Sequence, residues 1–166
     1  MKKTFSVAEI LNIISFYQHI NADENKAKEI GTKIRWALKK AISTMTDDAK
    51  NFEEFRTNEI DKIRNEFFTD EKSKEIVTPK LNKDGEPELD DEGNQLTETI
   101  REVNPEFKDD YDKTIKELND SLTEIASEEH EYEYKGVNMD DFVDSLSNNT
   151  SLTFEELSVL DAVLGE

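Results

Sequence analysis

The chain has 166 residues, of which 34% are hydrophobic and 37% are charged, and its formal net charge is −19. The absence of cysteine excludes disulfide bonds, thiolate metal sites and cysteine nucleophiles. No apolar run is long enough to span a bilayer, and no apolar signal-peptide core follows Met1, so we expect a cytoplasmic protein without membrane contacts.

The excess negative charge lies in the second part of the chain. Residues 1–70 carry 12 basic and 12 acidic side chains, whereas residues 71–166 carry 9 basic and 28 acidic ones. An acidic surface repels nucleic acid and attracts basic partners. We therefore expect protein partners and no direct contact with nucleic acid. A charge that serves solubility alone is the simpler alternative.

Residues 1–69 predict a helical hairpin. Ser6 and Glu9 form a capping box that begins the first helix. Residues 21–24 predict a tight turn and a new helix start. Because this connection is short, the first helix should fold back antiparallel on the second.

The second helix of this hairpin should be long, from Asn21 to about Thr69. Its apolar residues recur every three or four positions and form a narrow stripe that needs a partner helix, from this chain or from a second copy. A bend is expected at residues 43–48, whose side chains suit helix caps better than helix interiors.

Residues 70–103 predict an exposed acidic β-hairpin or long loop. Pro79 ends any preceding helix, and glycine-containing turn signals follow at residues 84–85 and 92–94. Apolar residues are sparse between these turns, so the segment should be only partly ordered without a partner. We find no internal repeat in the chain.

Residues 104–166 predict one long and two short helices. Asn104 and Pro105 begin a helix whose apolar stripe should pack antiparallel against the long helix. Residues 131–135 alternate in character and predict a short strand. Capping signals then predict helices at about 139–146 and 154–164.

These elements predict a mainly α fold, namely an elongated antiparallel helical bundle with one long helix and a protruding acidic β-hairpin or loop. We expect a single domain over residues 1–166. It would comprise a helical hairpin (1–69), the acidic segment (70–103), and a helix followed by short C-terminal helices (104–166).

The sequence predicts no catalytic residue, no metal ligand and no cofactor. The two histidines, His19 and His130, are isolated, and no His-Glu-x-x-His spacing occurs. An EF-hand alignment that places Gly93 at its glycine position puts Thr99 where the bidentate glutamate is required. Carboxylate pairs are too frequent among 40 acidic residues to indicate acid–base catalysis. We therefore expect that the protein is not an enzyme.

Six residues are candidates for partner contacts. Trp36 is the only tryptophan, and tryptophan and tyrosine are favoured in binding hot spots. The alternative for Trp36 is packing against the first helix. The complete set consists of Trp36, Asp90, Asp91 and Glu92 at an acidic turn, and Tyr132 and Tyr134 in the predicted strand.

The order of elements resembles a class of small acidic helical proteins of tailed bacteriophages and prophages whose function is unknown. The resemblance rests on a Lys/Arg-dotted helix at residues 33–38 and 52–56, an acidic Asp-Glu-Gly-Asn turn at 91–94, a helix at 107–122 and a Leu-Thr-x-x-Glu-Leu helix start at 152–157. Two features depart from the class: the linker 70–103 is longer, and a basic-proline turn after the first helix is absent.

The resemblance implies a phage origin and an interaction role. Our first functional hypothesis is a non-enzymatic phage protein that binds other proteins in virion structure or assembly, with self-association through the long helix. It would act in the host cytoplasm and become part of the virion. The alternative is a small acidic inhibitor of a host defence or nucleic-acid enzyme that mimics the charge of DNA.

Overall fold

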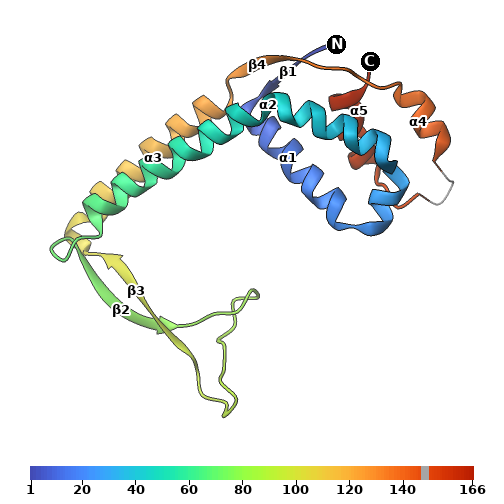
Figure 1. Ribbon diagram of the computed structural model, residues 1–166. Coiled ribbons are helices and arrows are strands. Elements are labelled where there is room, and N and C mark those ends of the chain that lie inside the picture. The colour runs from blue at the N-terminus through green and yellow to red at the C-terminus, as the bar shows by residue number, and fades with distance from the viewer. Residues whose placement is uncertain (147–149) are drawn as a thin grey trace. The chain divides into compact units, whose positions relative to one another are not determined.

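The computed structural model describes residues 1–146 and 150–166 and is mainly helical, as predicted (Figure 1). The chain forms two compact units, unit 1 (Met1–Phe55 and Leu122–Glu166) and unit 2 (Arg56–Ser121). A single domain stays a prediction. The elements are β1 (Lys2–Ser6), α1 (Val7–Ala22), α2 (Glu24–Phe67), β2 (Ser73–Pro79), β3 (Thr97–Val103), α3 (Pro105–Ala126), β4 (Glu129–Glu133), α4 (Met139–Ser145) and α5 (Phe154–Leu164).

The predicted start signals of α1 and α2 are confirmed. The Glu9 carboxylate accepts a hydrogen bond of 2.7 Å from the Ser6 backbone amide, and the Ser6 hydroxyl accepts one of 3.3 Å from the Glu9 amide. The Asp23 carboxylate in turn accepts bonds from the amides of Asn25 and Lys26. These bonds satisfy amides that have no partner within the helix, so each helix begins where a cap is available.

The break in α2 lies at Gly31 and not at residues 43–48, which are helical. Gly31 has φ 73° and ψ 164°, a backbone conformation that is almost confined to glycine. The expected bend was therefore misplaced. Threonine side chains within 43–48 donate hydrogen bonds to carbonyl groups of the preceding turn, for example Thr44 to Ala41, and so do not interrupt the helix.

A strand that the sequence analysis did not predict precedes α1. β1 pairs antiparallel with β4, with Lys2 opposite Glu133 and Phe5 opposite His130. The predicted strand at 131–135 corresponds to β4, which begins and ends two residues earlier. Phe5 is buried, so β1 contributes an apolar side chain to the core as well as its backbone.

The core of unit 1 joins α1, the N-terminal part of α2, β4 and the C-terminal helices. In Figure 1, α1 lies beside the first part of α2, and both contribute fully buried side chains such as Ile10 and Leu38. From the C-terminal part, Leu160 is also fully buried. α5 begins with the predicted capping box of Thr153 and Glu156. Helices far apart in sequence thus bury one another's apolar faces.

Unit 2 has a much smaller core. Ile63 and Phe67 at the end of α2 are buried with Val103, and the ring of Tyr111 from α3 meets Phe67 edge to face at 5.4 Å between centroids. Within this unit α3 therefore supplies the partner stripe that the sequence predicted for α2. β2 and β3 pair antiparallel, from Ser73 opposite Val103 to Pro79 opposite Thr97.

Residues 81–96 contain a tandem eight-residue repeat, so the expectation of no internal repeat was wrong. Asn82 and Asp90 occupy equivalent positions, and so do Gly85 and Gly93, which have φ 80° and 83°. Each Asn or Asp oxygen accepts hydrogen bonds from the amides two and four residues later, at 2.8–3.0 Å. One side chain and one glycine thus define each turn.

Candidate partner-binding surfaces

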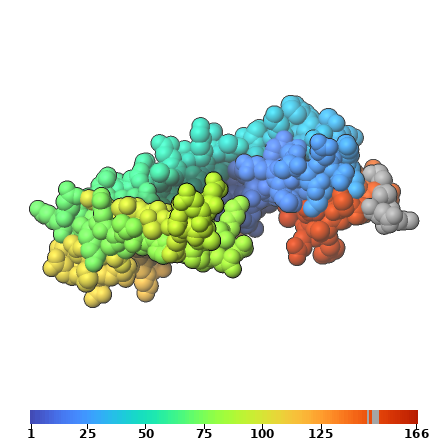
Figure 2. Space-filling view, turned by 90° about the horizontal axis from the view of Figure 1, so that it is seen from below, coloured from blue at the N-terminus to red at the C-terminus, as the bar shows by residue number. Residues whose placement is uncertain are grey.

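The β2–β3 hairpin and its turns expose aliphatic side chains. Val77, Leu89 and Leu81 are 69%, 60% and 53% exposed, and Leu96 and Ile100 are also exposed. In Figure 2 the yellow-green segment that contains the hairpin turns lies at the surface. A two-stranded hairpin is marginally stable in water, and exposed apolar side chains on it are candidates for partner contacts.

The predicted contact residues Asp90, Asp91 and Glu92 all lie in the second turn of the repeat and are exposed. Asp90 also has a structural role, because its carboxylate accepts hydrogen bonds from the backbone amides of Asn94 and Glu92 within the turn. The bonds from Asn94 and Glu92 also lower the pKa of this carboxyl. In the first turn the equivalent Asn82 side chain makes the same backbone bonds without a charge. The charge of Asp90 is therefore not needed to form the turn.

Trp36 lies at a groove of about 530 Å³ in unit 1, which we call the Trp36 groove. One wall is α2, with Lys33, Trp36 and Lys40, and the other is the segment 133–137, which begins at the last residue of β4. Trp36 is 54% exposed, so the alternative prediction, in which it packs against the first helix, is not supported. A half-exposed aromatic ring on a concave surface is typical of a binding anchor.

The Trp36 groove is basic although the protein is strongly acidic. Lys33, Lys40 and Lys135 contribute to its lining, against one carboxylate, Glu133. Lys39 and Lys40 also place their ammonium groups 5.9 and 5.4 Å from the centre of the Trp36 ring. Such cation–π contacts hold both lysines beside the indole.

Tyr134 also lines the Trp36 groove, and its hydroxyl donates a hydrogen bond of 2.8 Å to the carbonyl of Val163. Burial raises the pKa of Tyr134 to about 12. The structure thus brings together two of the six predicted contact residues, Trp36 and Tyr134, from opposite walls of one groove.

Tyr132, by contrast, is buried in the core of unit 1 and offers little surface to a partner. Its hydroxyl donates a hydrogen bond of 2.5 Å to Asp48 Oδ2, and His130 Nδ1 lies 3.9 Å from the same oxygen. Burial, together with the bond to Asp48, raises the pKa of Tyr132 above its usual range. Tyr132 therefore attaches β4 to α2, which is a structural role.

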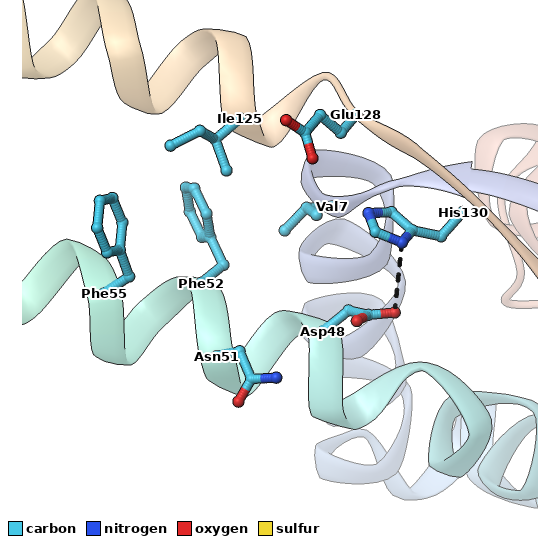
Figure 3. Close-up of a pocket in the computed structure, with 8 residues that line it drawn as sticks. All are labelled: Val7, Asp48, Asn51, Phe52, Phe55, Ile125, Glu128 and His130. Carbon is cyan, nitrogen blue, oxygen red and sulfur yellow. Dashed lines mark ion pairs between the residues drawn. The ribbon is translucent and has the colours of Figure 1, made fainter.

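A second concave site, of about 320 Å³, lies beside this network (Figure 3). Phe52 and Phe55 of α2 point toward Ile125 across an apolar space, and Asp48 and His130 lie at its other end. The lining has two carboxylates, Asp48 and Glu128, and one imidazole, but no hydroxyl or thiol group. It therefore resembles an incompletely filled core more than a catalytic centre.

Neither a metal cluster nor a membrane span occurs within residues 1–146 and 150–166. No group of three or more His, Asp or Glu side chains there is arranged to hold a metal ion. No helix in that part is both long enough and apolar enough to cross a membrane. The isolated His19 lies 3.8 Å from the Glu156 carboxylate on the exterior of unit 1.

Comparison of the chain with protein-family models, with curated proteins and with solved structures gave no match. The functional argument therefore rests on the surfaces themselves. Sequence reasoning noted the sparse apolar residues around the turns and the basic residues of the long helix. It did not identify the first as a contact surface or link the lysines to Trp36. The sequence did carry a signal for the lysines around Trp36, because Lys33, Trp36 and Lys40 are spaced so that they lie on one face of a helix.

Proposed function

We propose that the protein acts without catalysis, by binding other proteins, in the structure or assembly of a tailed-bacteriophage virion. The observation that carries the binding role is the exposed aliphatic surface of the β2–β3 hairpin, above all Val77 and Leu89. Covering such side chains provides about 25 cal/mol per Å² of apolar surface removed from water. The phage assignment rests on the resemblance in the order of elements.

Three finer expectations belong to this proposal. The helices would form an antiparallel bundle that carries the acidic hairpin, and the protein would use no cofactor. It would act in the host cytoplasm and then be incorporated in the virion. The charge of −19 supports protein rather than nucleic-acid partners, because the phosphate backbone repels an acidic surface.

The test is recovery of partners by the tagged protein from cells infected with the encoding phage, at low and high salt. We expect capsid, portal or tail proteins at both salt concentrations, because apolar contacts are little affected by salt. The double variant Val77→Thr, Leu89→Thr should lose them, while Thr99→Val, which adds apolar surface opposite Val77, should retain them. Recovery that is equal for both variants would show that the hairpin is not the contact surface.

A second candidate function, inhibition of a host nucleic-acid or defence enzyme by charge mimicry, is favoured by the repeated turns. Asp84 and Glu92 are exposed at equivalent positions of the two repeats, and Asp91 is exposed beside Glu92. The variant Asp90→Asn, Asp91→Asn, Glu92→Gln removes three charges and keeps the turn, because Asn82 makes the same bonds in the first repeat. Loss of a salt-sensitive host enzyme from this variant, with virion proteins absent, would favour mimicry.

A further inference from the structure

The Trp36 groove has the chemistry to bind an acidic segment that carries an exposed aliphatic side chain. Among the described residues no carboxylate forms an ion pair with Lys33, Lys40 or Lys135, whereas lysines elsewhere, such as Lys26 and Lys80, are paired at 2.6 Å. Unpaired cations around a half-exposed indole favour an anionic ligand with an apolar part.

The second turn of the repeat matches this requirement. Leu89 is 60% exposed and is followed directly by Asp90, Asp91 and Glu92, whose carboxylates are exposed. Backbone hydrogen bonds from Asp90 to Asn94 and from Gly93 to Asp90, at 2.8 and 3.0 Å, hold this turn in one conformation. A preformed turn loses less conformational entropy when it binds than a flexible segment would.

We propose that the acidic turn of one copy, residues 89–92, binds in the Trp36 groove of a second copy. Leu89 would cover the indole, while the carboxylates of Asp91 and Glu92 would pair with Lys40 and Lys135. This inference deepens the proposed function, on which it rests, by naming a second copy of the chain as one partner.

The contact would join two different surfaces, because the groove belongs to unit 1 and the turn belongs to unit 2. Two copies that exchange both contacts would close a dimer, whereas one contact per pair would continue into rings or filaments. This geometry is suited to an assembly component, and it makes the extent of association dependent on concentration.

Sedimentation velocity of the full chain over a range of concentrations tests the proposal. At low salt we expect the mean mass to rise with concentration, and at high salt to return toward that of the monomer, because the contact depends on charge. Trp36 is the only tryptophan, so its fluorescence should shift to the blue as the indole is covered. A monomer at all concentrations, or an unchanged Trp36 emission during association, would overturn the proposal.

Two charge-reversed variants make the test specific. The groove variant Lys40→Glu, Lys135→Glu and the turn variant Asp91→Lys, Glu92→Lys should each weaken self-association about tenfold or more. The control Lys28→Glu, Lys50→Glu makes the same change in net charge at other exposed positions of α2 and should weaken it much less. A control that weakens association as strongly as the groove variant would contradict the assigned site.

Mixing the two variants provides the decisive measurement. The acidic groove of the groove variant is complementary to the basic turn of the turn variant. The basic groove of the turn variant is likewise complementary to the acidic turn of the groove variant. Association should therefore return in the mixture and in neither variant alone. Circular dichroism of each variant confirms that it is folded. No recovery in the mixture would overturn this inference, while recovery of virion proteins by the tagged wild type would leave the proposed function intact.

Discussion

Unit 1 and unit 2 maintain their structures in different ways. In the described residues of unit 1, 18 buried side chains form one cluster, whereas the cluster of unit 2 has three buried members. Unit 2 depends more on local bonds, namely the β2–β3 ladder and the two turns of the repeat. Local bonds define a shape without a large core, but they leave the apolar side chains of the hairpin exposed.

This difference indicates which unit opens first. Segments with few buried apolar contacts exchange their amide hydrogens through low-energy openings. We expect amides of β2 and β3 to exchange faster than those of α1 and α5. The exposed surface that carries the proposed function therefore lies in the less stable unit, where binding of a partner would add the missing contacts.

The largest expected effect comes from the core of unit 1. Leu38 is fully buried, so Leu38→Ala should lower the free energy of unfolding by about 3–5 kcal/mol through lost transfer energy and a cavity. Ile63→Ala in unit 2 should lower the free energy of unfolding by less, because the side chains of its smaller cluster can move into the cavity. Urea unfolding with hydrogen exchange measures both changes. Equal losses would remove the distinction between the two units.

A smaller effect is expected from the ion pair between Lys26 and Glu156, 2.6 Å long and mostly buried. Lys26→Met should lower the free energy of unfolding by about 2 kcal/mol, because a buried carboxylate loses a charged donor. The matched control is Lys28→Met, which removes an exposed cation 4.0 Å from Glu24 and should cost less than about 0.5 kcal/mol.

The same pair has a pH dependence of known sign. Burial raises the pKa of Glu156, but the bonds from Lys26 and Thr153 outweigh it, so the pKa lies below its ordinary 4.5. A carboxyl group with a lower pKa in the folded than in the unfolded protein stabilises the fold at pH values above its unfolded-state pKa. This stabilisation is lost as the pH falls through the folded-state pKa. Wild-type unit 1 should therefore lose stability below about pH 4.5 more steeply than Lys26→Met, as acid titration of unfolding would reveal.

Removing the hydroxyl of Tyr132 should have a still smaller effect. Tyr132→Phe keeps the buried ring but deletes the bond to Asp48, so we expect a loss of about 1–2 kcal/mol. Because that bond attaches β4 to α2, exchange should increase in β1 and β4 while β2 and β3 stay unchanged. Faster amide exchange in β2 and β3 as well would contradict the expectation that the two units open independently.

The smallest global effect is expected in the repeat. Gly93 has φ 83°, so Gly93→Ala should strain its turn by about 1–2 kcal/mol and increase exchange locally. Asp90→Asn should change little, because asparagine makes the same bonds in the first turn, whereas Asp90→Ala should disorder the second turn. Amide chemical shifts of residues 90–94 distinguish these outcomes, and at concentrations where the chain is a monomer unit 1 should not respond to any of the three variants.

Features that depend on near neighbours were predictable from the sequence. The capping boxes at Ser6 and Thr153 and the Asn138 cap all join residues three positions apart, so the sequence specifies both partners of each bond. The repeat is equally local: Leu, Asn or Asp, and Gly recur at an offset of eight residues, at positions 81, 82 and 85 and again at 89, 90 and 93.

Features that depend on distant partners were not predictable in this way. β1 exists because residues 129–133 pair with it, more than a hundred positions later. A five-residue strand with one buried apolar side chain leaves no strong periodic signal. The break at Gly31 differs, because it had a local signal: Gly31 is the only glycine in residues 1–69, and glycine accepts the positive φ found there.

The candidate contact residues show the same division. The sequence alone determined that Trp36, the tyrosines and the acidic turn were available, because residue type and helical or turn spacing are local properties. Only the tertiary structure decided that Trp36 is half-exposed beside unpaired lysines while Tyr132 is buried against Asp48. The physical reason is that exposure depends on which distant segments cover a side chain, and no local pattern specifies them.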